Sequence, residues 1–243
     1  MLLAIDIGNT NITLGLFNGA RLVRRASIPT KEKKYSLRLK RILGKDKIDD
    51  ALICSVVPKA TGRLVKDLRR LFFKGPYIIG KDIVVPIKNL YRNPGQVGQD
   101  RLVNAYAGAM LYGTPLIVID FGTAVTFDVI SKDRGYLGGL ILPGMNLSLS
   151  ALSEHTALLP RVELAKPKEF IGRDTKNSML SGIVYGFAAL TDDIISRLKK
   201  KIGKARVIAT GGDAKIVSGY AKSLSKVDTD LTLKGIALTF YLT

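Results

Sequence analysis

The feature that most constrains the fold of this chain is a segment that occurs twice. An apolar run, Leu2–Ile5, leads into an Asp-x-Gly turn at Asp6 and then into alternating apolar residues. The same plan recurs at Leu116–Ile119 and Asp120. Short apolar runs are typical of buried strands, and apolar–polar alternation is typical of half-buried ones. Internal duplication explains both copies, so we expect two similar halves.

Each copy continues with alternating helices and strands. Asn18-Gly19 is a strong hairpin signal, so a third strand should follow at 22–28. Apolar spacing predicts helices at 35–43, 61–72 and 178–202, and strands at 51–57, 77–79 and 206–209. Gly203 provides a stop for the last helix. The sequence therefore predicts two α/β halves that meet near 113–115.

Composition excludes several classes of protein. A chain of 243 residues with 47% apolar content can bury substantial cores, which excludes a disordered or disulfide-stapled chain. Cys54 and His155 are the single cysteine and histidine, so neither an intrachain disulfide nor a usual Cys/His zinc site can form. The N-terminus lacks signal-peptide features, and uninterrupted apolar stretches fall short of the roughly 18–20 residues of a membrane helix. We expect a cytoplasmic protein without a membrane partner.

The net charge of +18 is unusual and is typical of nucleic-acid binders. Eleven lysines and arginines fall within residues 21–47. Interleaved aromatic residues, zinc-finger spacing and Gly-rich aromatic signatures are absent from this segment, so solvated helix and strand faces explain it most simply. Attraction of an anionic small molecule, such as a nucleotide, and binding of a polynucleotide both remain open.

Both Asp-x-Gly turns follow the carboxyl ends of strands, where open α/β sheets bind ligands. Backbone N–H groups of such turns can approach phosphate oxygens, and the hydroxyls of Thr10 and Thr123 can add hydrogen bonds. The carboxylates of Asp6 and Asp120 can hold cations. One such turn could be purely structural. The duplicated pair favours two facing turns that grip one phosphate-bearing ligand.

Two further motifs admit two interpretations each. Asp100-Arg101 stands at the start of a predicted helix, where Asp100 could cap the helix or act as a general base. Arg101 could pair with a substrate carboxylate. The run 210–214, Thr-Gly-Gly-Asp-Ala, follows a predicted strand. It could accommodate a flat base or ribose, or serve only as a tight turn.

Together these residues resemble the type III pantothenate kinase family over essentially the whole chain. The resemblance rests on seven motifs in order: Asp6-x-Gly8-Asn9-Thr10, Gly98-x-Asp100-Arg101, Asp120-x-Gly122-Thr123-Ala124-x-Thr126, Gly138-Gly139-x-Ile141-x-Pro143-Gly144, Thr156-Ala157-x-Leu159-Pro160, Gly172-x-x-Thr175 and Thr210-Gly211-Gly212-Asp213-Ala214. It implies an α/β fold of duplicated actin-like (ribonuclease H-like) domains at residues 1–114 and 115–243. Each would be a mixed sheet flanked by helices, with a cleft between the domains.

The resemblance also implies an activity: ATP-dependent phosphorylation of the primary hydroxyl of pantothenate, the first step of coenzyme A biosynthesis. Asp100 would accept the proton, and Asp120 would bind a monovalent cation, potassium or ammonium, required alongside magnesium. Thr175 would reach pantothenate from the neighbouring subunit of a homodimer. The ATP phosphates would contact Asp6, Ile7, Gly8, Asn9, Thr10, Asn11, Ile12, Thr13 and Thr123, and the pantothenate pocket would include Tyr91, Gly98, Gln99, Asp100 and Arg101.

Two alternatives stay open. The chain could be a sister kinase for another small alcohol. It could also be a non-catalytic nucleic-acid-binding or regulatory protein on the same fold, although nucleic acid is the less favoured partner despite the charge.

Overall fold

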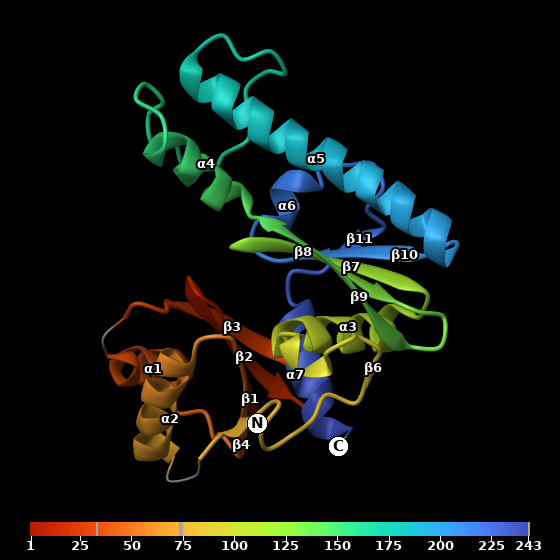
Figure 1. Ribbon diagram of the computed structural model, residues 1–243. Coiled ribbons are helices and arrows are strands. Elements are labelled where there is room, and N and C mark those ends of the chain that lie inside the picture. Colours follow the sequence, from red (N-terminus) through yellow and green to blue (C-terminus); the bar gives the residue numbers. More distant parts are fainter. Residues whose placement is uncertain (33, 73–74, 243) are drawn as a thin grey trace. The chain divides into compact units, whose positions relative to one another are not determined.

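The structure is a computed structural model that describes residues 1–32, 34–72 and 75–242 (Figure 1). Lys33, part of the basic segment, lies outside the described residues. The chain divides into two compact units, Met1–Ala107 together with Asp230–Thr243, and Gly108–Thr229. The domain limits 1–114 and 115–243 stay a prediction.

The first unit is built on a five-stranded sheet with the order β3-β2-β1-β4-β5. The strands β1, β2 and β3 form an antiparallel meander, whereas β1–β4 and β4–β5 are parallel. Their bounds are β1 (Leu2–Ile7), β2 (Asn11–Asn18), β3 (Arg21–Pro29), β4 (Asp50–Ser55) and β5 (Tyr77–Ile78). Helices α1 (Tyr35–Leu43) and α2 (Pro58–Phe72) connect them. The predicted helix at 61–72 therefore begins one turn earlier, at a proline that suits a first helical turn.

The second unit repeats this topology. Its strands follow the order β9-β8-β7-β10-β11, with an antiparallel meander and then two parallel pairings. Both meanders also carry a register shift near the end of the middle strand, between Leu16 and Phe17 and between Val129 and Ile130. The bounds are β7 (Leu116–Phe121), β8 (Ala124–Ile130), β9 (Gly135–Pro143), β10 (Arg206–Thr210) and β11 (Lys226–Val227). The predicted duplicated α/β architecture is confirmed.

Side-chain alternation along β1 decides which residues enter which core. Leu3, Ile5 and Ile7 lie in the core that packs against α1 and α2. Since successive strand residues point to opposite faces, Leu2, Ala4 and Asp6 face the other way. That second face is covered by α7 (Leu231–Tyr241), which contacts β1, β2 and β4. Asp6 is therefore placed on the α7 side of the sheet.

Helix α3 (Gln99–Tyr112) packs closely on α7 within the first unit. A side chain at Gly235 would come within 2.6 Å of Val103 and 3.0 Å of Ala107, so only glycine permits this approach. Helix α7 is not among the helices expected from the sequence. Its mostly buried apolar residues lack a polar stripe, which removes the periodic signal. Between β5 and α3 lie β6 (Lys88–Asn89) and the short 3₁₀ turn η1 (Pro94–Gln96).

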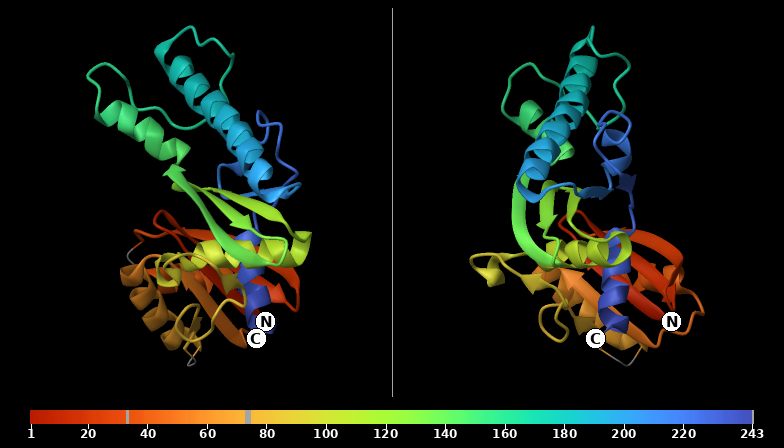
Figure 2. Two further views of the ribbon diagram at one scale, coloured as in Figure 1. Left: turned by 45° about the vertical axis from the view of Figure 1, so that its right-hand side comes forward. Right: turned by 90° about the vertical axis from the view of Figure 1, so that its right-hand side faces the viewer.

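The two parts of the long helix α5 (Thr175–Ile202) pack against different neighbours. Buried residues such as Ala188 and Ile195 pack on the sheet of the second unit, over the core of Ile117, Ile119 and Val207. Its N-terminal part packs instead with α4 (Met145–Glu154), and both extend away from this sheet (Figures 1 and 2). By length and composition, α5 could cross a membrane, but its apolar stripe is used in these cores.

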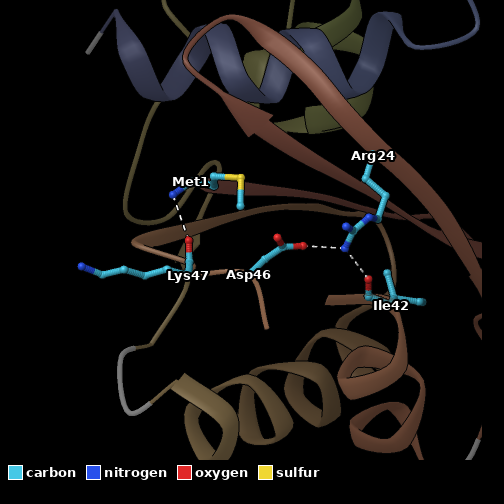
Figure 3. Close-up of polar contacts among 5 residues, drawn as sticks. All are labelled: Met1, Arg24, Ile42, Asp46 and Lys47. Carbon is cyan, nitrogen blue, oxygen red and sulfur yellow. Dashed lines mark hydrogen bonds and ion pairs between the residues drawn. The ribbon is translucent and has the colours of Figure 1, made fainter. Parts of the chain in front are cut away.

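Part of the basic segment 21–47 is engaged within the first unit (Figure 3). Arg24 on β3 donates to the backbone oxygen of Ile42 at 2.8 Å and pairs with Asp46 at 2.5 Å. The N-terminal amine of Met1 donates to the Lys47 carbonyl at 3.0 Å. Arg25 and Arg38 also form ion pairs, with Asp230 and Glu32. Several of these cations thus form local ion pairs while their side chains stay partly exposed to solvent.

Candidate functional site

Asp6 and Asp100 both act electrostatically on Cys54 in the first unit. Asp6 at the end of β1 is the direct neighbour of Cys54 on the parallel strand β4. Burial raises the pKa of the Cys54 thiol well above its usual value, and the carboxylates of Asp6 and then Asp100 raise it further. Asp6 is adjacent to the thiol across the strand pair, and the influence of Asp100 places it in the same region of the first unit. The structure thus brings together two aspartates that are far apart in sequence and were both predicted as site residues.

Asp100 occupies the first turn of α3, where its carboxylate accepts a hydrogen bond of 2.9 Å from the backbone N–H of Arg101. Burial raises the pKa of Asp100, and the Arg101 amide and guanidinium oppose that shift only in part. Asp100 is therefore the second residue of the helix and not its cap, and its carboxylate has the raised pKa that suits a general base. Its role as the base stays a prediction. Arg101 beside it is itself buried, at 8% exposure.

The residues around Asp100 are held by close backbone contacts. Gly98 immediately precedes α3, and a side chain there would collide with the Asp100 carboxylate. Gly80 has a φ of +82°, and a side chain there would come within 2.7 Å of the Gln99 side chain. Tyr91 lies in the preceding loop, half-buried, with its N–H bound to the Asn89 side chain at 3.0 Å. These contacts fix the main chain of the predicted pantothenate pocket.

The turn after β1 is open to solvent on one side and anchored on the other. Asn9, Thr10 and Asn11 are exposed. The Gly8 N–H closes the turn on the Asn11 carbonyl at 3.0 Å. Thr30 donates its hydroxyl to the Gly8 carbonyl at 2.7 Å and its N–H to the Thr10 carbonyl at 2.9 Å. An exposed, glycine-bearing turn of this kind can contact phosphate oxygens.

The turn after β7 carries Asp120, Gly122 and Thr123 and is shaped by neighbouring backbone. Its Gly122 N–H bonds the Ala124 carbonyl at 3.1 Å, and Thr123 is exposed. A side chain at Gly144 would collide with the Gly122 carbonyl, and one at Gly211 would collide with the Asp120 carboxylate. Strand alternation puts Asp120 on the face of β7 opposite the α5 core.

The run 210–214 converges on this second turn. Gly211 has a φ of +93°, and the N–H of Asp213 bonds the Phe121 carbonyl at 3.1 Å. Asn146 donates to the Asp213 carboxylate at 3.0 Å, while burial raises the pKa of Asp213. Asn146 and Gly144 did not enter the predicted site. Gly144 belongs to the Gly138–Gly144 motif of the sequence, but only the fold shows that it lies against the turn after β7.

Thr175 lies apart from the Asp120 turn within its own unit, because α5 begins at the end that extends away from the sheet (Figure 1). The loop before it is wound tightly onto the helix: Asp174 accepts from the Asn177 N–H at 2.8 Å, and Ser178 donates to the Gly172 carbonyl at 3.1 Å. Thr175 itself is exposed. Its predicted contact with pantothenate from a neighbouring subunit stays a prediction.

A dedicated metal cage is absent from the part of the chain that the structure describes. Within these residues, no three or more His, Cys, Asp or Glu side chains are grouped to hold an ion. Magnesium in kinases is commonly held by one or two carboxylates together with substrate phosphates and water. Single carboxylates at strand ends, as at Asp6 and Asp120, fit that mode of binding.

Comparison with known proteins gives a consistent result. Residues 2–197 match the family model described as type III pantothenate kinase. Type III pantothenate kinases from Pelobacter propionicus and Agathobacter rectalis are each 41% identical to the chain over 99% of its length, covering 98% and 96% of theirs. A solved structure from Campylobacter jejuni, with a suggested role as a Baf family transcriptional activator, aligns with a TM-score of 0.61 at 20% identity over 99% and 98% of the two chains. That likeness shows the fold alone.

Proposed function

The chain belongs to the type III pantothenate kinase family, and from this premise we propose that it transfers the γ-phosphoryl group of ATP to the primary hydroxyl of pantothenate. This reaction is the first step of coenzyme A biosynthesis. The observation that carries the proposal is the full-length match at 41% identity to enzymes of that name. The location of Asp6 and Asp100 around Cys54 supports it, because it places a candidate phosphate-binding turn and a candidate base in one unit.

We assign Asp100 as the general base that takes the proton from the substrate hydroxyl. Its raised pKa brings it closer to the neutral range, where a base works best. Tyr91 and the segment Gly98–Arg101 would line the pantothenate pocket, with the Arg101 guanidinium as a fork-shaped partner for the pantothenate carboxylate. Hydroxyl attack on phosphorus depends mainly on positioning and charge neutralisation, which these groups provide.

The residues Asp6 to Thr13, together with Thr123, are proposed to contact the ATP phosphates. Magnesium, when bound with ATP, would neutralise phosphate charge during transfer. Asp120 is proposed to bind the monovalent cation, potassium or ammonium, since its half-buried carboxylate stands beside backbone carbonyls. Both proposals rest on oxygen-rich strand ends, the donor type that these hard cations prefer.

We further propose that the active form is a homodimer located in the cytoplasm. The end formed by α4 and the start of α5 exposes large apolar side chains, Leu147 at 50%, Leu158 at 91%, Phe170 at 68% and Ile171 at 76%. Exposed apolar side chains of this size are the kind that a protein interface covers. A second copy that covers them would lie near Thr175, as the proposed role of this residue requires.

A coupled assay tests the function directly. The purified chain with ATP, magnesium, potassium and pantothenate should produce ADP and 4′-phosphopantothenate, and omission of potassium should lower the rate. Turnover only with another small alcohol would reassign the protein to a sister kinase. Binding of duplex DNA or RNA with a steep salt dependence, combined with absent turnover, would favour the nucleic-acid alternative.

A further inference from the structure

Thr30 is the residue that anchors the exposed turn after β1, and it is itself held by two side chains. Tyr35, the first residue of α1, donates its hydroxyl to the Thr30 carbonyl at 2.6 Å. Arg63 of α2 donates to the same carbonyl at 3.3 Å and to the Tyr35 hydroxyl at 3.0 Å. Its guanidinium carbon also lies 5.2 Å from the centre of the Tyr35 ring. The three side chains form one connected network.

This network is positioned to act on the turn. Tyr35 is 1% exposed and Thr30 is 5% exposed, so hydrogen bonds among these groups are screened little by water. Arg63 adds a further hydrogen bond of 3.4 Å to the Glu32 carbonyl, which keeps the chain after β3 in place. Loss of the Tyr35 hydroxyl would therefore release Thr30 from α1 while the rest of the core remains packed.

The direction of the Thr30 hydrogen bonds has a consequence for the turn. Thr30 binds the carbonyl oxygens of both Gly8 and Thr10. In a planar trans peptide the carbonyl of one residue and the N–H of the next point in opposite directions. The N–H groups of Asn9 and Asn11 must therefore point away from Thr30. Backbone N–H groups that a turn holds in fixed directions can contact an anion.

We propose that Tyr35 and Arg63 are positioning residues for nucleotide binding: they fix Thr30, and Thr30 directs the N–H groups of the turn after β1 toward the phosphates of ATP. The proposal rests on the proposed kinase function and specifies how its phosphate site is prepared before ATP arrives. Neither side chain needs to contact ATP. Their effect is to lower the entropy that the turn loses when it binds phosphate.

The test is Tyr35→Phe, which keeps the ring and its packing but removes the hydroxyl. The dissociation constant and KM for ATP should rise about 3- to 10-fold, the range expected for one buried hydrogen bond. The KM for pantothenate and kcat at saturating ATP should stay near wild type. Isothermal titration with ATP and magnesium gives the dissociation constant without reliance on turnover.

Two controls separate positioning from a general loss of stability. Tyr136→Phe removes another fully buried tyrosine hydroxyl, which donates to Asp128 at 2.9 Å in the second unit. It should lower the melting temperature without weakening ATP binding. Lys66→Gln removes a charge from the exposed face of α2 one turn beyond Arg63 and should leave ATP binding unchanged.

Substitutions at Thr30 and Arg63 test the other two members of the network. Thr30→Val should weaken ATP binding, whereas Thr30→Ser, which keeps the hydroxyl, should restore it. Arg63→Gln should weaken ATP binding by a smaller factor than Tyr35→Phe, and its exposed position makes misfolding a minor concern. Wild-type ATP affinity in Tyr35→Phe, Thr30→Val and Arg63→Gln would overturn the inference. Failure of the wild-type chain to phosphorylate pantothenate would instead overturn the proposed function.

Discussion

The turn after β1 and the turn after β7 share a sequence pattern but are supported in different ways. In the first, three residues separate the strands, and side-chain hydrogen bonds from Thr30 hold the turn. In the second, two residues separate the strands, and the backbones of Gly144 and Gly211 press against the turn. Duplication has preserved the strands and their order, whereas the support behind each turn has diverged. The two halves can therefore take different parts in one reaction.

The largest expected effect is on kcat and tests whether Asp100, in the first unit, is the general base. Asp100→Asn should lower kcat by about 10²- to 10⁴-fold while ATP affinity stays close to wild type, because the amide cannot accept the proton. Burial raises the pKa of Asp100, so wild-type activity should fall on acidification at a higher pH than an ordinary aspartate would give. Steady-state kinetics across pH measure both, with Asp133→Asn, a substitution at an exposed aspartate of the second unit, as a surface control. Near-normal turnover of Asp100→Asn would remove this residue from its role.

The second-largest effect is on stability. It tests whether the turn after β7 depends on close backbone contacts more than the turn after β1 does. Gly211→Ala should destabilise the protein by about 3 kcal/mol, since φ is +93° and the new carbon would lie 2.5 Å from the Phe121 carbonyl oxygen. Gly8→Ala should cost less than about 1 kcal/mol, because the nearest atom, the Asn11 carbonyl oxygen, is 3.3 Å away. Urea-induced unfolding of both variants measures the contrast. Equal losses of stability in the two variants would contradict the conclusion that neighbouring backbone supports the turn after β7.

A third prediction distinguishes Asp6 from Asp120 by the cation on which each variant should depend. Asp120→Asn should raise the potassium concentration needed for half-maximal activity about tenfold, the effect of one lost charge interaction of about 1.4 kcal/mol. Asp6→Asn should instead impair the response to magnesium and ATP. Titrations of activity with each cation distinguish the variants. A potassium response that is unchanged in Asp120→Asn would place the monovalent site elsewhere.

The smallest expected effect concerns the start of α5. Asp174 caps this helix through the Asn177 N–H and side chain, and these bonds lower the pKa of Asp174. A carboxylate whose pKa is lowered by folding stabilises the protein above its unfolded-state pKa and loses that contribution as the pH falls. Asp174→Ala should therefore lower the melting temperature slightly at neutral pH and less in acid. Asp174→Asn, which still accepts the cap hydrogen bond, is the control; an equal loss in both would argue against the cap.

Much of the fold could be predicted from sequence because strands and amphipathic helices have clear periods. The helix at 35–43 has the predicted bounds, and the strand at 206–209 is extended only to Thr210. Helix α7 was missed because it is buried nearly all round, and α4 because its apolar spacing is weak. That Asp6 and Asp100 both act on Cys54 could not be predicted from spacing, since it depends on how the start of α3 packs in the first unit.

By itself, the sequence determined the duplicated strand–turn–strand plan, the family, and the residues that could carry chemistry, since these are properties of local pattern and residue type. The tertiary structure alone decided that Asp6 and Asp100 share the surroundings of Cys54, that Thr30 fixes the first turn, and that glycines at 144 and 211 shape the second. Contacts of this kind join segments far apart in the chain. They depend on packing and burial, which residue order does not encode locally.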